Sequence, residues 1–350
     1  MNFEINGHNI IQILLITFMT SFFLVYLVKK VAVHINAIDI PNERKVHKKP
    51  IPRLGGLAIY LAFLLGYILY GTITTQMISV LIGGFIIILT GIVDDVNPIP
   101  AKYKFICQVV AALIVVLYGK LYFNNISLLG FNWIFPTWIN MILSTLFIVA
   151  IINAINLVDG LDGLCSGISI IYFITITILG FILNSLGGLD IILSLIMIGA
   201  ITGFLFHNFP PAKIFMGDTG SMFIGFTIAV TSLLGYKVAT ITSLIIPILI
   251  LFIPIIDTIC AIIRRTLKHE SIGTPDEEHL HHQLLRLTTS PTKTVLLIYL
   301  IDLVFSAISI LYVLGDNEVA IMLYVIVMIC FLFLVLKTNI LFDRKKEKKK

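Results

Sequence analysis

Long apolar runs alternate along this chain with short polar segments that hold most of its charged residues. The runs are continuous, whereas strands of a membrane β-barrel alternate apolar and polar positions. Most runs approach the length of about 20 residues that a helix needs to cross a bilayer. The pattern predicts an all-α, polytopic membrane protein with eleven spans, or ten if one shorter run does not cross. Their approximate cores are 10–28, 54–70, 77–93, 104–118, 137–153, 163–184, 190–207, 220–235, 240–262, 294–314 and 319–338.

Composition supports the membrane class. Of the 350 residues, 58% are hydrophobic and only 12% are charged, whereas a soluble domain carries about 25% charged residues. The first run lacks a preceding basic region and is too long for the apolar part of a secretory signal, so we expect it to be retained. The four cysteines stand singly without a C-x-x-C pair, which argues against a disulfide framework and a thiolate zinc site.

The lysines and arginines predict the orientation of the chain. If the N-terminus lies outside, all 24 of these residues except Lys120 and Lys237 fall in cytoplasmic segments, in agreement with the positive-inside rule. Residues 1–338 then form one transmembrane domain, with cytoplasmic loops at 29–53, 94–103, 154–162, 208–219 and 263–293. Residues 339–350 form a basic cytoplasmic tail, and such a tail is attracted to the inner leaflet. The net charge of +5 therefore requires no nucleic-acid partner.

Every elaborate polar motif falls on the predicted cytoplasmic side. A transporter would be expected to place polar groups near the middle of the membrane, at broken helices. The one-sided arrangement instead favours an enzyme that acts on a cytosolic substrate at the membrane surface. The motifs are VHKKPIPRLGG (46–56), DDVNPIPAKYK (94–104), NAINLVDGLDGL (153–164), HNFPPAKIFMGDTGS (207–221) and RRTLKHESIGTPDEEHLHHQLLR (264–286).

Carboxylates in two of these motifs predict a divalent-cation site. Asp94 and Asp95 are adjacent where a span meets the cytosol, and neighbouring carboxylates repel each other unless a cation compensates. Asp218 stands between Gly217 and Thr219, where small residues allow close approach of a ligand. Mg²⁺ prefers a few protein carboxylates together with phosphate oxygens. The alternative for Asp94 and Asp95 is a solvated pair at a helix end.

The third motif adds a polar stripe. Asn156, Asp159 and Asp162 are spaced at i, i+3 and i+6, so on a helix all three could face one cavity. Gly160 and Gly163 indicate a broken or tightly packed helix end. The alternative is a polar helix start in which Asp162 is only the cap.

The last motif combines histidines with arginines. Imidazoles and guanidinium groups can donate hydrogen bonds to phosphate oxygens, which favours a diphosphate-binding loop. A zinc site is an alternative, although the spacing is not that of a usual zinc loop; a polar loop without special chemistry is another. The residues concerned are Arg264, Arg265, His279, His281, His282 and Arg286. Acids for a metal, donors for phosphates and a membrane setting together indicate phosphoryl transfer to a lipid.

From about Asp39 to Arg286, these motifs resemble those of the polyprenyl-phosphate N-acetylhexosamine-1-phosphate transferases, glycosyltransferase family 4. The bacterial undecaprenyl-phosphate N-acetylglucosamine-1-phosphate transferases are the most similar branch. The resemblance implies a Mg²⁺-dependent reaction, with Mn²⁺ as an alternative ion. In it, undecaprenyl phosphate attacks a UDP-sugar, UMP leaves, and a lipid diphospho-sugar remains. Members of this family often form dimers, so the resemblance also makes a homodimer a possible assembly of this chain.

The resemblance assigns roles by motif position. By this resemblance, Asp218 is the magnesium ligand. Asp94, with Asp95 beside it, deprotonates or positions the lipid phosphate. Asp159, with Asn156, matches the polar wall around the nucleotide and the metal, and Asp159 and Asp162 are further candidate catalytic residues. The substrate-binding positions that it implies are Lys48 or Lys49 near the lipid phosphate, Asn156 beside the nucleotide and the metal, Asn208 and Phe215 at the uracil, and the three histidines of the last motif at the diphosphate. Arg53 of the PIPRLGG segment is a further candidate substrate-binding residue, and the arginines of the last motif are suited to the diphosphate by their chemistry.

Two alternatives to this reaction stay open. The PIPRLGG and HLHH segments resemble the N-acetylglucosamine branch, whereas the muramoyl-pentapeptide branch typically has a Thr-Met-Gly-Gly stretch and three consecutive histidines; another amino sugar is a further option. A transporter or flippase of a lipid-linked sugar is the rival from a different class, and its only support is Asp257 and Asp302 within predicted spans. For the transferase we expect one in-line displacement rather than an aspartyl-phosphate intermediate, because the lipid phosphate is itself largely dianionic at neutral pH.

Overall fold

The computed structural model describes residues 4–5, 7–41, 49–124, 126–128, 131–183, 185, 187–237, 245–267, 279–315 and 317–337. Several sequence predictions fall partly or wholly outside these residues. They are Lys48, residues 42–48 of the loop 29–53, the start of the predicted span 240–262, the middle of the loop 263–293, the last residues of the spans 163–184 and 319–338, and the basic tail 339–350.

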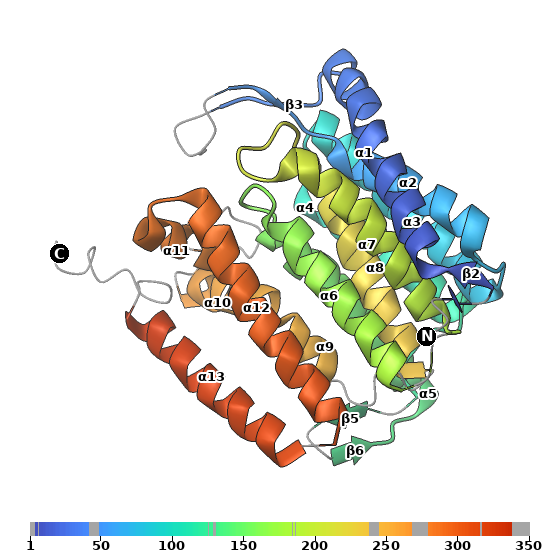
Figure 1. Ribbon diagram of the computed structural model, residues 1–350, viewed down its shortest axis with the longest axis vertical. Helices are drawn as coiled ribbons and strands as arrows, with labels where there is room; N and C mark the ends of the chain where they lie inside the picture. Colours follow the sequence, from blue (N-terminus) through green and yellow to red (C-terminus); the bar gives the residue numbers. More distant parts are fainter. Residues whose placement is uncertain are drawn as a thin grey trace.

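The described chain is helical apart from three short two-stranded antiparallel hairpins, so the predicted all-α class is confirmed (Figure 1). The hairpins pair β1 (Glu4–Ile5) with β2 (His8–Asn9), β3 (Ile38–Asp39) with β4 (Ile51–Pro52), and β5 (Ile126–Leu128) with β6 (Phe131–Trp133). The helices are α1 (Ile10–His34), α2 (Gly55–Tyr70), α3 (Thr75–Val96), α4 (Ala101–Leu113, continued by a π-helical turn, Ile114–Tyr118), α5 (Thr137–Val158), α6 (Leu164–Ile182), α7 (Leu189–Asn208), α8 (Gly217–Lys237), α9 (Ile245–Ile250), α10 (Phe252–Leu267), α11 (Leu280–Thr288), α12 (Pro291–Val313) and α13 (Asn317–Lys337).

Eight helices in the described part of the chain are long and apolar enough to cross a membrane: α1, α3, α4 with its π-helical turn, α5, α6, α7, α8 and α12. Two shorter apolar helices, Gly55–Tyr70 and Glu318–Phe331, accompany them. The protein is thus a multi-pass membrane protein. The predicted span 240–262 differs from one continuous helix, because α9 ends at Ile250 and α10 begins at Phe252. Pro254 supplies a physical reason, since it has no N–H to donate to the carbonyl of Ile250.

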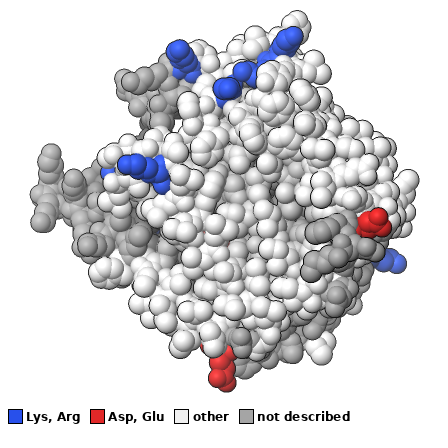
Figure 2. All heavy atoms as spheres, viewed as in Figure 1, with Lys and Arg blue, Asp and Glu red and all other residues white. Residues whose placement is uncertain are grey.

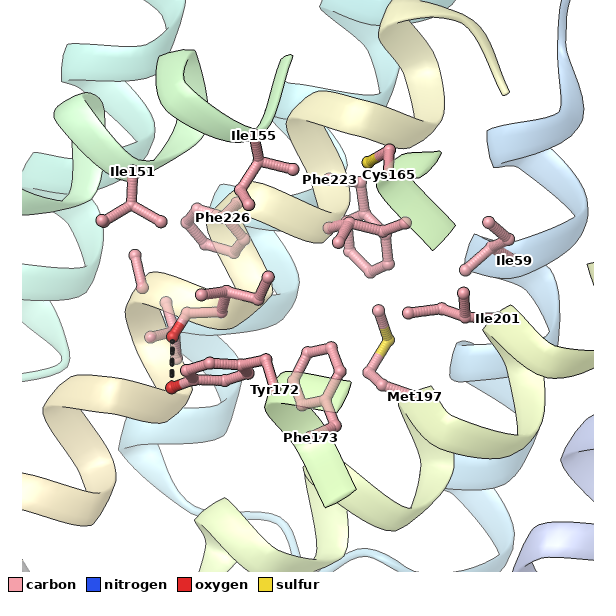
Figure 3. Close-up of a cluster of buried hydrophobic side chains, with 14 of the residues drawn as sticks. Ile59, Ile151, Ile155, Cys165, Tyr172, Phe173, Met197, Ile201, Phe223 and Phe226 are labelled. Carbon is pink, nitrogen blue, oxygen red and sulfur yellow. Dashed lines mark hydrogen bonds between the residues drawn. The ribbon is translucent and has the colours of Figure 1, made fainter. Parts of the chain in front are cut away.

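Helix α8 forms the centre of the bundle. It packs against α2, α3, α5, α6 and α7, and 94% of its apolar segment within Gly217–Gly235 is buried. Phe223 and Phe226 of α8 belong to the same cluster of buried apolar side chains as Ile155 of α5 and Phe173 of α6 (Figure 3). The hydroxyl of Tyr172 satisfies its polarity there by hydrogen bonding to the Ile228 carbonyl at 3.3 Å and to Ser232 Oγ at 2.6 Å.

The outer surface is apolar, as expected for a protein solvated by lipid. Ile68 is 75% exposed and Phe333 66%, and an apolar exterior is favourable only where hydrocarbon replaces water. Figure 2 shows a broad face whose middle carries no charged side chain among the described residues, while most of the visible basic side chains lie along its upper edges.

Polar connections gather at one end of the bundle, which we call the polar end. The β3–β4 hairpin, the loops between α5 and α6 and between α7 and α8, and α11 lie there, whereas β5 and β6 lie at the opposite end (Figure 1). Segments far apart in sequence thus meet at a single end, and the candidate site is built from them.

Candidate functional site

A cavity of about 1150 Å³ opens at the polar end. Its walls come from the β3–β4 hairpin, the α5–α6 and α7–α8 loops, and the first turns of α8, α11 and α12. Nine of the residues singled out in the sequence line it: Lys49, Arg53, Asn156, Asp159, Asp162, Asn208, Phe215, Asp218 and His282.

Three carboxylates form the acidic centre of the site. Asp94 and Asp95 lie in the last turn of α3 and Asp218 in the first turn of α8. One oxygen from each lies within 4.8 Å of the others. Hard divalent cations prefer such carboxylate oxygens, so these residues fit a magnesium or manganese ion.

Two cations stabilise this acidic centre. Arg53 Nε lies 2.9 Å from Asp95 Oδ1, and its Nη2 lies 3.0 Å from Asp218 Oδ1. Lys104 Nζ lies 3.1 Å from Asp94 Oδ1 and 2.9 Å from Asp218 Oδ2. Burial opposes the charge of Arg53, but the surrounding carboxylates outweigh it and raise the pKa of Arg53 above its ordinary value.

Asp95 differs from its two partners because it caps α8. Its carboxylate accepts hydrogen bonds from the backbone N–H of Asp218 at 2.9 Å and of Thr219 at 3.0 Å, and from Thr219 Oγ1 at 2.6 Å. A carboxylate is favourable at a helix N-terminus, where backbone N–H groups lack partners. With Arg53 as a further partner, Asp95 anchors the end of α3 to the start of α8 and so positions Asp218.

Glycines allow α3 and α8 to come this close. A Cβ on Gly91 of α3 would lie 2.3 Å from Thr219 Cα. Gly217 has φ +71, a left-handed conformation that favours glycine, and a Cβ there would lie 2.3 Å from Asp95 Oδ2. Gly217, the first glycine of the MGDTG segment, is therefore required by the turn that presents Asp218.

Backbone pairing holds Arg53 beside this turn. Arg53 N–H donates to the Ala37 carbonyl at 2.9 Å, and Phe215 N–H donates to the Pro52 carbonyl at 2.8 Å. Gly55 N–H in turn donates to the Phe215 carbonyl at 2.9 Å. The PIPRLGG segment and the segment before α8 thus run side by side, and both Arg53 and the half-buried Phe215 reach the cavity.

The predicted helical stripe of Asn156, Asp159 and Asp162 is wrong as geometry. Helix α5 ends at Val158, so Asp159 and Asp162 lie in a turn. Asp162 is also not the cap of α6, which begins after Gly163 without a side-chain cap; Asp162 Oδ2 instead accepts a hydrogen bond from Ala212 N–H at 2.8 Å. All three residues nevertheless line the cavity, because the chain turns back across its wall.

Asp159 and Asn156 lie next to the acidic centre. Asn156 Nδ2 donates to Ser221 Oγ of α8 at 2.8 Å. Burial, and secondly the charge of Asp218, raise the pKa of Asp159 to about 7. A carboxyl that changes its protonation near neutral pH is common in functional sites.

Asn208 lines the cavity, but its side chain is committed to the fold. Its Oδ1 accepts from Gly163 N–H at 3.0 Å, and its Nδ2 donates to the Ile214 carbonyl at 3.0 Å. These bonds join the start of α6 to the loop before α8. A contact from this amide to a nucleotide base would require one of them to be exchanged.

The histidines are held by Asp257 of α10. Its Oδ2 lies 3.1 Å from His279 Nδ1, and its Oδ1 accepts from Leu280 N–H at 2.8 Å at the start of α11. His281 is buried, and its Nε2 has no hydrogen-bond partner among the described residues. That nitrogen faces Gly160, where a Cβ would lie 2.2 Å away. His282 lines the cavity itself.

Burial, and secondly the neighbouring His282, lower the pKa of His281 to about 3. The ring is therefore neutral at physiological pH and offers one N–H donor and one acceptor. Arg264 and Arg265 are buried in α10 and are not among the residues that line the cavity. The structure thus brings His282 of the last motif to the cavity but not these arginines.

Several site residues did not emerge from the sequence. From the sequence, Lys104 contributes only to the predicted orientation, although it stands in the DDVNPIPAKYK motif with Asp94. Lys29 and Lys213, also counted only for orientation, line the cavity together with Asp39. The apolar run around Asp257 predicts that this residue lies within a span. Only the position of α11 beside it reveals its contact with His279.

Comparison with known proteins identifies the relatives of this chain. The sequence model described as glycosyl transferase family 4 matches residues 77–236. A Bacillus subtilis protein named probable undecaprenyl-phosphate N-acetylglucosaminyl 1-phosphate transferase is 42% identical over 340 residues, 96% of this chain and 94% of that protein. The decaprenyl-phosphate N-acetylglucosaminephosphotransferase of Mycolicibacterium smegmatis is 36% identical over 78% of this chain and 74% of its own. The undecaprenyl-phosphate alpha-N-acetylglucosaminyl 1-phosphate transferase of Escherichia coli is 32% identical over 89% and 85%.

Proposed function

This chain belongs to glycosyl transferase family 4, and we propose that it transfers N-acetylglucosamine-1-phosphate from UDP-N-acetylglucosamine to undecaprenyl phosphate. UMP leaves, and the lipid diphospho-sugar remains to start a cell-wall polymer of the teichoic-acid or O-antigen type. The observation that carries this proposal is the 1150 Å³ cavity at the end of a membrane bundle, where an acidic centre lies among basic side chains. Relatives whose names state this reaction support it.

Mg²⁺ is the proposed cofactor, with Mn²⁺ as the alternative. Asp218 and Asp94 are its proposed ligands, because the bonds of Asp95 to α8 and Arg53 occupy that carboxylate. When bound, the ion neutralises phosphate charge that builds up on the leaving UMP. The protein's own contribution is to hold both phosphate groups in line and to exclude alternative geometries.

The donor is proposed to bind across the α5–α6 turn. His282 lines the cavity, and Nε2 of the buried, neutral His281 lies next to Gly160 of this turn; either ring can donate one hydrogen bond to a diphosphate oxygen. Phe215 offers a ring at the cavity wall for the uracil. Lys29, Lys49 and Lys213 line the same cavity and are cations for the acceptor's phosphate.

A single displacement suits this site better than an aspartyl-phosphate intermediate. Asp95 is not a free nucleophile, because Thr219 and Arg53 hold its oxygens. Asp94 accepts from Ile99 N–H at 3.0 Å and lies against Lys104. The acceptor phosphate brings its own negative oxygen and needs no strong base.

The polar end is proposed to face the cytoplasm, with the N-terminus outside. The lysine and arginine distribution supports this orientation. Lys29, Lys49, Arg53, Lys104 and Lys213 all lie at or beside the cavity at that end. UDP-sugars are cytosolic, so a cytoplasmic cavity gives the donor access while the lipid arrives from the bilayer.

The transporter alternative loses one of its two supports. Asp257 is tied to His279 and to the start of α11, so it serves the histidine segment. Asp302 stays buried in α12. Transport also requires no chemistry on the donor, and UMP release therefore separates the two functions.

The decisive experiment supplies purified protein in detergent with undecaprenyl phosphate and either UDP-N-acetylglucosamine or UDP-N-acetylmuramoyl-pentapeptide. We expect UMP release with the first donor, only when Mg²⁺ or Mn²⁺ is added, and its loss with EDTA. Release with the pentapeptide donor alone would reassign the substrate. No UMP from either donor with the metal present would contradict a transferase.

A further inference from the structure

Lys104 stands between the two carboxylates best suited to bind the ion. Its Nζ bridges Asp94 Oδ1 at 3.1 Å and Asp218 Oδ2 at 2.9 Å. The Lys104 side chain is only 24% exposed, and those of Asp94 and Asp218 are 5% and 14% exposed. A divalent cation that takes oxygens from both acids must therefore share or replace the position of this ammonium group.

Arg53 is bound differently and is expected to stay. Its Nε pairs with Asp95, which caps α8 and is fully buried, and its backbone is fixed by pairing with Ala37. Lys104 has a flexible four-carbon side chain on the first turn of α4, and its ammonium is a mobile point charge. Of the two cations, Lys104 is the one that can leave without breaking the frame of the site.

The charges give a reason for the exchange. Among the described residues, Arg53 and Lys104 form the ion pairs of Asp94, Asp95 and Asp218, so these five side chains together carry one net negative charge when the three carboxyl groups are ionised. Addition of a divalent cation makes the group positive by one charge, which favours an anionic diphosphate. The displaced ammonium then has fewer carboxylate contacts and can donate to phosphate oxygens.

We propose that Lys104 is a built-in counter-cation of the ion site. Its ammonium bridges Asp94 and Asp218 while no divalent ion is bound, leaves that position when the ion enters, and then binds a phosphate oxygen. This inference rests on the metal-dependent function proposed above. Its test, however, measures ion and nucleotide binding, so it can fail independently of UMP release.

The first test is Mn²⁺ binding without substrates, measured from the electron paramagnetic resonance signal of free Mn²⁺. Lys104→Met removes the competing charge and should bind Mn²⁺ at least about tenfold more tightly than the wild type, because a like charge a few ångströms away is strongly unfavourable. Lys102→Met on the same helix removes an exposed lysine and should leave the affinity unchanged. Unfolding cannot tighten ion binding, so a gain supports the exchange. Unchanged or weaker affinity in Lys104→Met overturns it.

The second test uses the intact wild-type side chain and does not depend on whether Lys104→Met folds. Lysines are ¹³C-methylated, which keeps their charge, and the Lys104 signal is identified by its absence in Lys104→Arg. Saturating Mg²⁺ should shift this signal, and EDTA should restore it. Binding of the ion without any shift of the Lys104 signal overturns the proposal.

The phosphate role has its own readout. At saturating Mn²⁺, Lys104→Met should bind UDP about tenfold more weakly by calorimetry, although it binds the ion more tightly. These opposite changes distinguish an exchange from a structural defect, which would weaken both. UDP affinity equal to the wild type overturns the phosphate-binding step.

Discussion

Thr219 donates two hydrogen bonds to Asp95, from its backbone N–H at 3.0 Å and from its hydroxyl at 2.6 Å. This pair joins two helices that are more than a hundred residues apart in sequence. It also gives the adjacent residues Asp94 and Asp95 different tasks. Asp95 joins the two helices, whereas Asp94 pairs with Lys104 and is a proposed ligand of the ion.

The first prediction separates these tasks. Asp95→Ala leaves buried donors of Thr219 and Asp218 without partners, so the free energy of unfolding should fall by at least about 2 kcal/mol. Asp94→Asn should keep most of the stability and lose most of the UMP release. Thermal unfolding in detergent and turnover are measured for both variants. Equal loss of stability in the two would show that their roles are not distinct.

The second prediction concerns Asp218. Asp218→Asn keeps the shape of the side chain but removes its negative charge and replaces one of its two ligand oxygens by an NH₂ group, which cannot ligate an ion. Turnover should fall by orders of magnitude, while the thermal unfolding midpoint without metal changes little. Stabilisation by added Mg²⁺ should also disappear in this variant. Near-normal Mg²⁺-dependent turnover would refute Asp218 as a metal ligand.

The third prediction tests the close approach of α3 and α8. A Cβ on Gly91 would lie 2.3 Å from Thr219 Cα, whereas one on Gly84 would lie 3.3 Å from the ring of Phe223. Gly91→Ala should cost about 1–3 kcal/mol of stability and should weaken Mn²⁺ binding, because it moves Asp94 away from Asp218. Gly84→Ala is the matched control and should have a small effect. Similar behaviour of the two variants would contradict this account.

The fourth prediction concerns pH. In the folded chain the pKa of His281 is lowered to about 3, whereas an unfolded histidine has a pKa of about 6.5. Below pH 6.5 the unfolded chain therefore binds a proton that the folded chain does not. Stability should be lost as pH falls, by at most about 1.4 kcal/mol per pH unit from this residue. In EDTA, His281→Gln should show a smaller drop of the unfolding midpoint from pH 7 to pH 5 than the wild type.

Asp159 supplies the control of opposite sign. Its folded pKa of about 7 lies above the ordinary value, so protonation of the folded chain adds stability as pH falls from 7 towards 4. Asp159→Asn removes that contribution, and its unfolding midpoint should drop more steeply than that of the wild type. Parallel pH profiles for all three proteins would contradict both assignments.

The fifth prediction assigns His282 to the donor. His282 lines the cavity, whereas Asp257 holds His279 behind it. His282→Ala should raise the KM for UDP-N-acetylglucosamine about tenfold, the usual scale for one hydrogen bond to a charged group. The KM for undecaprenyl phosphate should stay nearly constant. An equal rise for both substrates would indicate a structural role instead.

Much of the fold could be predicted from the sequence because membrane insertion depends on local physics. A run of about 20 apolar residues is stable in hydrocarbon only as a helix, since its backbone must satisfy its own hydrogen bonds. The all-α multi-pass class and the family followed from hydropathy and motifs. The broken run around Leu251 did not, because a hydropathy pattern does not report where a helix is interrupted.

The candidate site could also be predicted only in part from the sequence. The residue types, Asp94 with Asp95, the MGDTG turn and the histidines, are visible in the sequence and predict phosphate and metal chemistry. The distances between these residues cannot be predicted from the sequence, because each distance depends on contacts between segments that are remote in sequence. Spacing alone suggested a helical stripe through Asp159 and Asp162, but a turn after Val158 breaks that helix.

The sequence by itself therefore determined that the chain is a helical membrane protein of this family with acids and bases along its polar loops. Only the tertiary structure decided which of them work together. It made Asp95 a helix cap, placed Lys104 between Asp94 and Asp218, and turned Asp257 towards His279. The reason is that solvation acts on each segment separately, whereas a charged side chain takes its role from the partners that packing brings within about 3 Å of it.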